Sequence, residues 1–104
     1  METEQITKIA KLNDVFRRGG FGGTITHGVQ ELNDVAGLLR AVRTFEAFTE
    51  DNDPYHEHDF GSIIWEDQKV FWKIDYYDQR LEFGELPLSR KCWRILTVML
   101  ADEY

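Results

Sequence analysis

Two stretches with a two-residue hydrophobic period, joined by a short polar segment, restrict the fold of this chain most strongly. In the first stretch, Ile63 and Trp65 lie on one side and Ile64 lies on the other. The second stretch, residues 70–76, places four large side chains on one side: Val70, Trp72, Ile74 and Tyr76. The polar residues 66–69 between the stretches have the length of a hairpin turn. This alternation predicts an antiparallel hairpin with one covered face.

Two further strands are predicted from shorter patterns. Leu81 and Phe83 alternate with charged residues after a turn near residues 77–79, which predicts a third strand of a meander at residues 80–83. Residues 24–29 are rich in β-branched side chains, which favours a short strand there. Together these patterns predict an antiparallel β-meander of three to four strands.

Apolar residues that recur every three or four positions predict two helices in the first half of the chain. The first helix begins near Thr3 and ends at the glycine-rich residues 19–23. Its apolar stripe comprises Ile6, Ile9, Leu12 and Phe16. The second helix begins after Asn33, a favourable N-cap residue, and extends to about Phe48. Its apolar stripe comprises Val35, Leu38, Leu39, Val42 and Phe45.

A third helix is predicted near the end of the sequence. Pro87 precedes it, and Ser89 is its candidate cap. Its apolar stripe comprises Cys92 or Trp93, Leu96, Met99 and Leu100. The fold class that these patterns predict is α+β, an antiparallel β-meander of three to four strands with about three helices packed on one face.

Length, composition and charge restrict the class of protein. With 104 residues, we expect a single domain that spans residues 1–104. The chain is 42% hydrophobic and 13% aromatic, which excludes a disordered chain. Its net charge of -7 disfavours direct binding to nucleic acid and favours a protein partner with a basic surface. The sequence shows no signal-peptide pattern and no apolar run of membrane-spanning length, so we expect a cytoplasmic protein without membrane contact.

The most distinctive polar stretch is EDNDPYHEHDFG, residues 50–61, which we call the acidic segment because it holds five acidic residues beside two histidines. Asn52 and Pro54 are strong turn formers, so we expect an ordered connection between the second helix and the meander. Its carboxylates suit a basic partner. The predicted partner-binding residues are Glu50, Asp51, Asp53, Tyr55, Glu57 and Asp59.

The acidic segment also supports a metal-binding alternative. His56, His58 and Asp59 are ligand types that zinc or manganese prefers, and His27 from a distant predicted strand could complete the set. The spacing excludes a calcium-binding EF-hand loop, because His56 replaces the required glycine and Ser62 replaces the bidentate glutamate. The sequence contains no nucleophile-elbow or kinase motif, so we predict no catalytic residue and no cofactor outside this alternative.

Four segments carry a family resemblance: LNDVFRR at residues 12–18, FTEDNDPYHEHDFG at 48–61, FWKIDYYD at 71–78 and LTVMLADEY at 96–104. Together they resemble a family of small, mainly proteobacterial proteins that is often carried on plasmids and phages and is catalogued as a domain of unknown function. The resemblance implies no established activity and no catalytic residues. It also implies that glycine is common at the position of His56, which disfavours a metal site shared by the family.

Three functional hypotheses follow from these observations. The preferred one is a small acidic, non-enzymatic protein-interaction module of a bacterial mobile element, which binds a basic protein surface. A counter-defence inhibitor of the anti-CRISPR or anti-restriction type is its most specific version. The alternative is a small metal-dependent enzyme that uses His56, His58 and Asp59. The third is a homodimer formed through a self-complementary sheet or aromatic face.

Overall fold

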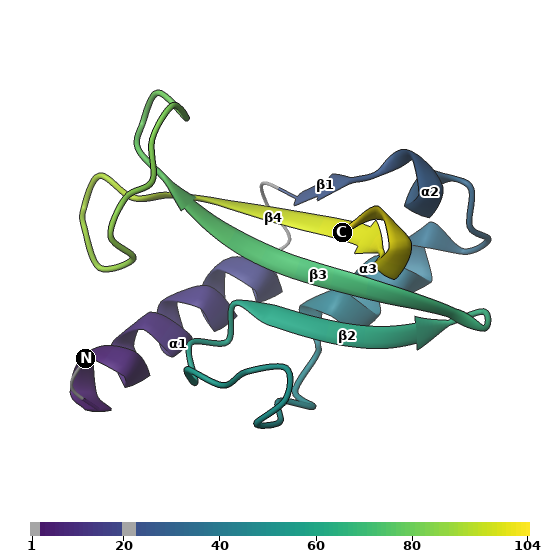
Figure 1. Ribbon diagram of the computed structural model, residues 1–104, viewed down its shortest axis with the longest axis horizontal. Coiled ribbons are helices and arrows are strands. Elements are labelled where there is room, and N and C mark those ends of the chain that lie inside the picture. The colour runs from purple at the N-terminus through teal and green to yellow at the C-terminus, as the bar shows by residue number, and fades with distance from the viewer. Residues whose placement is uncertain (1–2, 20–22) are drawn as a thin grey trace.

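Four strands form one sheet, and the two longest helices lie on one of its faces. The computed structural model describes residues 3–19 and 23–104 of the protein. Its elements in chain order are α1 (Thr3–Gly19), β1 (Gly23–Ile25), α2 (His27–Gln30), α3 (Val35–Arg43), β2 (Phe60–Trp65), β3 (Gln68–Tyr77), β4 (Trp93–Leu100) and the 3-10 helix η1 (Ala101–Glu103). Figure 1 shows α1 and α3 behind the sheet, and we call the opposite face the open face. Across the described ranges, no helix is long and apolar enough to cross a membrane.

The predicted hairpin is confirmed. β2 and β3 are antiparallel, with Phe60 opposite Lys73. The two residues between the strands, Glu66 and Asp67, have φ angles of 51° and 65°. Two consecutive left-handed residues are typical of a type I′ turn, whose twist matches that of the flanking strands. The turn therefore fixes the register that places the alternating apolar residues on one face.

The hydrophobic core lies between the sheet and the helices. Trp72 is fully buried, and the ring of Phe45 meets it edge-on with 5.4 Å between the centroids. The main buried cluster comprises Val29, Leu38, Val42, Phe45, Val70, Trp72, Ile74, Leu96 and Val98. Each fully buried side chain of this size contributes about 1.5–3 kcal/mol through the hydrophobic effect. The helix-facing positions of β3 and β4 thus supply most of the sheet side of the core.

Helix α3 begins near its predicted start but ends earlier than predicted. Its N-cap is Asp34, whose carboxylate accepts a backbone N–H at 3.0 Å. The helix ends at Arg43 and does not reach Phe48. Phe45 and Phe48 then pack edge-on against Trp72, with centroid distances of 5.4 and 6.1 Å. Aromatic packing in a non-helical segment overrides the local helical period here.

The predicted third helix is wrong, because its apolar stripe lies on β4. This strand pairs antiparallel with β3, with Val98 opposite Trp72. Leu96 and Val98 are buried against the helices, and Met99 is buried at a position of the opposite alternation. A strand that carries apolar residues on both faces reads as a nearly continuous apolar run, which also fits a helical spacing over two turns. Three β-branched residues favour the strand: Ile95, Thr97 and Val98.

The sheet is mixed, which corrects the prediction of a purely antiparallel meander. Its strand order is β1-β4-β3-β2, and β1 pairs parallel with β4, with Ile25 opposite Val98. The strand predicted at residues 24–29 is shorter than expected, because the Thr26 hydroxyl accepts a backbone N–H and caps α2. A parallel partner far away in the sequence leaves no local signal of this pairing.

The strand predicted at residues 80–83 is also wrong. The chain turns at Asp78, whose carboxylate accepts two backbone N–H groups at 3.1 and 3.0 Å. Leu81 has a φ angle of 59°, in the left-handed region that leucine seldom adopts. An isolated bridge between Tyr77 and Gly84 pairs this part of the chain with the end of β3. Side-chain capping by an aspartate therefore overrides the alternation of apolar residues.

Substituting Gly61 with alanine should destabilise the protein. Gly61 lies in β2 against the fully buried indole of Trp72, and an added Cβ would collide with that ring. Because the core holds the ring in place, we expect the free energy of unfolding, measured by urea denaturation, to fall by about 1–3 kcal/mol. Gly84→Ala is the matched control, since its Cβ would lie 3.9 Å from the nearest atom, the Tyr76 carbonyl oxygen. Equal losses in both variants would contradict the packing argument.

Candidate functional site

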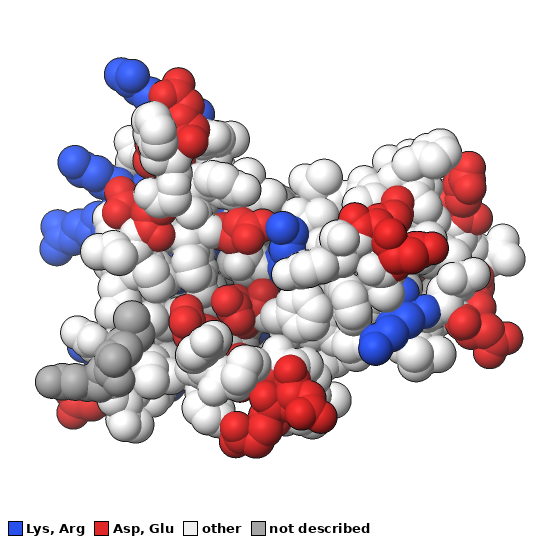
Figure 2. Space-filling view, in the orientation of Figure 1, with Lys and Arg blue, Asp and Glu red and all other residues white. Residues whose placement is uncertain are grey.

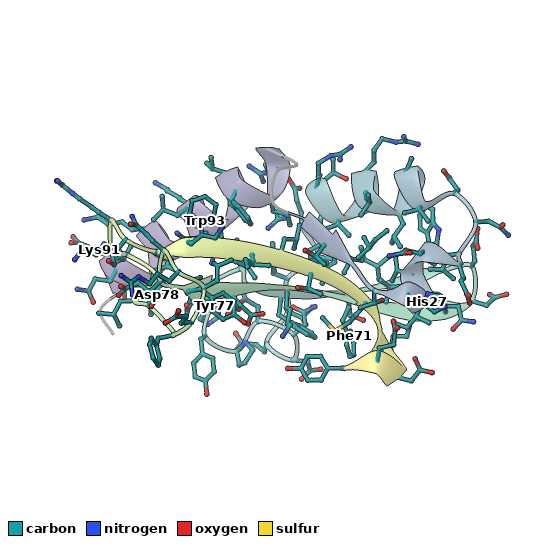
Figure 3. All side chains as sticks on the ribbon, turned by 90° about the horizontal axis from the view of Figure 1, so that it is seen from above. His27, Phe71, Tyr77, Asp78, Lys91 and Trp93 are labelled. Carbon is teal, nitrogen blue, oxygen red and sulfur yellow. The ribbon has the colours of Figure 1, made fainter. Side chains whose placement is uncertain are left out.

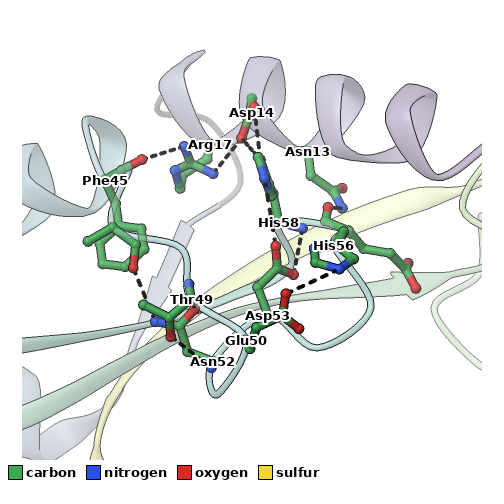
Figure 4. Close-up of polar contacts among 12 residues, drawn as sticks. Asn13, Asp14, Arg17, Phe45, Thr49, Glu50, Asn52, Asp53, His56 and His58 are labelled. Carbon is green, nitrogen blue, oxygen red and sulfur yellow. Dashed lines mark hydrogen bonds and ion pairs between the residues drawn. The ribbon is translucent and has the colours of Figure 1, made fainter. Parts of the chain in front are cut away.

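A buried arginine anchors the chain ahead of the acidic segment to helix α1. Arg17 is fully buried, and its guanidinium group donates to the Phe45 carbonyl oxygen at 2.9 Å and to the Asp14 carboxylate at 3.1 Å (Figure 4). Its central carbon lies 4.9 Å from the ring centroid of Trp72 and 5.4 Å from that of Phe48. Burial lowers the pKa of Arg17, and the Asp14 carboxylate opposes this shift. Hydrogen bonds to an ionised group and cation–π contacts both strengthen where water is excluded.

His58 lies between the carboxylate of Asp14 on α1 and that of Asp53 in the acidic segment. Its Nδ1 lies 3.0 Å from Asp14, and its Nε2 lies 3.6 Å from Asp53. The imidazole stacks flat on Phe48, with centroids 3.8 Å apart and an interplanar angle of 4°. Asp53 is 3% exposed and accepts the backbone N–H of His58 at 3.1 Å. Although Asp53 is a predicted partner-binding residue, its carboxylate is thus engaged inside the protein.

The structure does not bring the three histidines together. His56 is exposed, and its Nε2 lies 3.8 Å from Glu50. His27 at the start of α2 pairs with Glu31, the C-cap of that helix, at 3.0 Å, and Figure 3 shows His27 at one end of the molecule. Within the described parts of the chain, no group of three or more His, Cys, Asp or Glu side chains is placed to hold a metal ion. His56 has a φ angle of 60°, which glycine, the residue that the resemblance implies here, adopts without strain.

The other predicted partner-binding residues differ in exposure. Glu50, Asp51 and Tyr55 are exposed on the acidic segment. Glu57 is half-buried, and its carboxylate accepts the hydroxyl of Tyr76 at 3.1 Å. Burial raises the pKa of Tyr76, so its hydroxyl remains a hydrogen-bond donor. The exposed residues are available to a partner, whereas Glu57 also holds the segment to β3.

Asp51 and Asp59 lie in a cleft of about 350 Å³, which we call the acidic cleft. Its lining residues are Asp51, Asn52, Pro54, Asp59, Phe60, Lys73, Ile74, Asp75 and Tyr104. Lys73 and Asp75 form an ion pair at 3.0 Å. Three aspartates and one lysine thus line the cleft, which gives it an excess of acidic groups. Figure 2 shows carboxylates gathered in the middle of the open face.

The part of the acidic cleft that lies on β3 was not predicted. Lys73 and Asp75 occupy alternate positions of the predicted strand at residues 70–76, so the period of two places them on the same face. No local pattern connects them with Asp51, because the chain passes through β2 and a turn between these residues. The sequence also gives no signal that Tyr104 lines the cleft.

Three aromatic rings form a cluster beside the acidic cleft. The centroids of Phe60 and Phe71 are 5.0 Å apart, and Tyr104 stands edge-on to them at 6.1 and 5.8 Å. Two ammonium groups already lie against these rings. The Nζ of Lys69 is 5.5 Å from the Phe71 centroid, and the Nζ of Lys73 is 6.0 Å from the Tyr104 centroid. Because the faces of aromatic rings carry partial negative charge, the cluster attracts cations.

Asp59 gives the acidic cleft a charge that changes close to neutral pH. Burial, followed by the nearby charge of Glu57, raises the pKa of Asp59 from 3.8 to about 6. The backbone carbonyl of Asp59 accepts the N–H of Ile74 at 2.8 Å, which fixes the residue at the start of β2. The cleft therefore becomes less negative as the pH falls through this range.

Replacing Arg17 with methionine should strongly destabilise the fold. The substitution removes the donor to the Phe45 carbonyl and leaves the Asp14 carboxylate without its guanidinium partner. Loss of one member of a buried ion pair typically costs about 3–5 kcal/mol, and we expect a decrease of about 3 kcal/mol in the free energy of unfolding. Chemical denaturation measures this quantity.

Arg18→Met is the matched control for this experiment. Arg18 is the next residue on α1, but its side chain is exposed and lies 3.5 Å from Glu46. An exposed pair of this kind contributes less than about 1 kcal/mol. Comparable losses in the two variants would show that the buried site of Arg17 has no special role.

Asp59→Asn should change how stability depends on pH. The pKa of Asp59 in the folded protein, about 6, lies above the ordinary value of 3.8. The resulting contribution to stability is therefore fully present below the ordinary value and is lost as the pH rises through the folded value. At about pH 7 we expect the variant to be more stable than the wild type by about 1 kcal/mol, and this advantage should vanish near pH 4. Thermal denaturation at several pH values tests this, and parallel profiles would refute it.

Comparison with known proteins gives one match. A family model described as a protein of unknown function, DUF3768, matches residues 25–103, which include the acidic segment and all of β2, β3 and β4. No curated protein and no solved structure matches the chain significantly. The expected relation to a family of unknown function is therefore confirmed.

Proposed function

The chain belongs to the DUF3768 family of proteins of unknown function, and we propose that it is a non-enzymatic protein-interaction module. In this proposal the acidic cleft binds a cationic side chain of a partner protein with a basic surface. The observation that carries the proposal is the surplus of carboxylates over ammonium groups in an open cleft beside a cation-attracting aromatic cluster.

The chemistry of the acidic cleft favours an arginine side chain of the partner. Lys73 is paired with Asp75 at 3.0 Å, which leaves Asp51 and Asp59 to accept hydrogen bonds from a further donor. A planar guanidinium group donates in a fork that matches carboxylates, and it also lies flat on aromatic rings such as that of Tyr104. An ammonium group offers the charge without this planar match.

The charge of the whole chain supports the same kind of partner. A net charge of -7 attracts a basic surface over a distance and speeds the encounter. Nucleic acid is disfavoured as a direct ligand, because its phosphates would meet the carboxylates of the cleft. A protein whose basic surface normally binds nucleic acid is the more specific version of this partner. In its most specific form, the proposal is a counter-defence inhibitor of the anti-CRISPR or anti-restriction type that binds such a surface.

The double substitution Asp51→Asn with Asp75→Asn should weaken the binding of a short arginine-rich peptide. Because each carboxylate at the rim of a site contributes roughly 0.5–1 kcal/mol, we expect about a tenfold increase in Kd. Isothermal titration calorimetry at low ionic strength measures this change. A lysine-rich peptide of the same charge should bind the wild type more weakly than the arginine-rich peptide does.

The control variant combines Glu31→Gln with Asp67→Asn. It changes the net charge by the same amount at two exposed residues that do not line the acidic cleft. We expect its Kd to rise by less than about twofold. Equal effects of the two double variants would show that net charge alone attracts the peptide. If neither the arginine-rich nor the lysine-rich peptide binds the wild-type protein, the proposal is refuted.

A further inference from the structure

The loop between β3 and β4, residues 78–92, presents apolar side chains that the described residues leave uncovered. The exposed ones are Leu81, Phe83, Leu86 and Leu88, and we call them the loop surface. Phe83 and Leu86 are 70% and 72% exposed. Exposed apolar groups that occur together mark interaction sites more often than isolated ones do. We propose that two copies of the chain form a two-fold symmetric dimer through this loop surface.

The backbone of the loop is held by side-chain hydrogen bonds from the loop and from β4. The carboxylate of Asp78 accepts two backbone N–H groups at 3.1 and 3.0 Å, and Arg94 donates to the Pro87 carbonyl oxygen at 2.7 Å. Leu81 is held at a φ angle of 59°, which costs a leucine on the order of 1 kcal/mol. Such strain persists where the surroundings fix it, commonly in segments with a function. An ordered backbone lowers the entropic cost of forming a contact.

The charges of the loop favour a second copy of the chain as the occupant. The loop has three acidic residues, Asp78, Glu82 and Glu85, and three basic residues, Arg80, Arg90 and Lys91. The remaining 16 of 19 acidic and 9 of 12 basic residues lie elsewhere, so the rest of the chain carries the whole net charge of -7. Two copies that meet through this loop therefore bring no like net charges into contact. A loop with no net charge also lacks the attraction that an anionic membrane exerts on a basic one.

The charges of the loop are unevenly distributed along its sequence. Residues 78–85 hold all three acidic residues and Arg80, a net charge of -2, whereas Arg90 and Lys91 give residues 86–92 a net charge of +2. Figure 3 shows Asp78 and Lys91 at the same end of the molecule. In a two-fold symmetric contact, when one residue of the first copy touches a second residue of the other copy, the second residue of the first copy also touches the first residue of the other. In the proposed dimer the acidic part of each loop would face the basic part of the other.

Sedimentation velocity over a range of concentrations tests the dimer. The wild type should dimerise reversibly, and the double substitution Phe83→Asp with Leu86→Asp should raise the dissociation constant at least about 100-fold. Ile64→Asp is the matched control, because Ile64 is also exposed, at 68%, but lies on β2 outside the loop. It should leave the dissociation constant within about twofold of the wild-type value. Equal effects of the two changes would overturn the proposal.

A charge exchange tests the two-fold arrangement. Glu82→Lys and Lys91→Glu, both at exposed positions, should each weaken the dimer about tenfold, because each gives the loop a net charge that repels its own copy. The combined variant restores a neutral loop and should bring the dissociation constant back to within about threefold of the wild type. Additive weakening in the combined variant would contradict the arrangement.

Two results would contradict the proposed dimer. A protein that stays monomeric at about 1 mM has no dimer of this kind. A monomer that binds vesicles containing phosphatidylserine through Phe83 uses the loop surface for a membrane, which also overturns the proposal. Neither result bears on the acidic cleft, because none of its lining residues belongs to residues 78–92.

Discussion

The burial of one cation, the guanidinium group of Arg17, determines how helix α1, the acidic segment and the sheet fit together. Removing such a group from water costs several kcal/mol, and the fold offsets this cost with a carboxylate, a carbonyl oxygen and two aromatic rings. These partners come from α1, β3 and the segment after α3, so each restricts the position of the others. Asp14 serves twice, since it pairs with Arg17 and with His58. The main effect of the buried cation is therefore geometric, because it gives the acidic segment one defined shape.

The elements that could be predicted are those whose pattern is local and has one meaning. The hairpin of β2 and β3 follows from a period of two and a short polar turn, and the extent of helix α1 follows from apolar residues at helical spacing before Gly19. The buried face of α1 was not predicted, because Asn13 and Arg17 are buried whereas Leu12 of the predicted stripe is exposed. Strand β4 could not be recognised, because apolar residues on both of its faces produce a spacing that a helix shares. The turn at Asp78 replaced a predicted strand, since its carboxylate satisfies backbone donors that a strand would have paired.

The candidate site also contains residues that could be predicted and residues that could not. Asp51 and Asp59 come from a segment whose composition draws attention by itself, whereas Asp75 comes from the open face of a strand and joins them only in the folded protein. For Asp53, the prediction of a partner-binding carboxylate does not match its burial. This residue resembles its neighbours in sequence, yet it is buried beside His58. Exposure of a carboxylate in a turn-rich segment depends on partners that are distant in the chain, which a local pattern does not contain.

Strand β4 is the last of the described strands in the chain, but it lies inside the sheet, between β1 and β3. On the ribosome, β1 has no partner until residues 93–100 have left the exit tunnel. Until that moment, the edge of β3 that later pairs with β4 has no partner strand. Exposed edges and apolar faces on a nascent chain favour aggregation, and pairing between distant segments is slow. The sheet therefore closes only when residues 93–100 pair with β1 and β3.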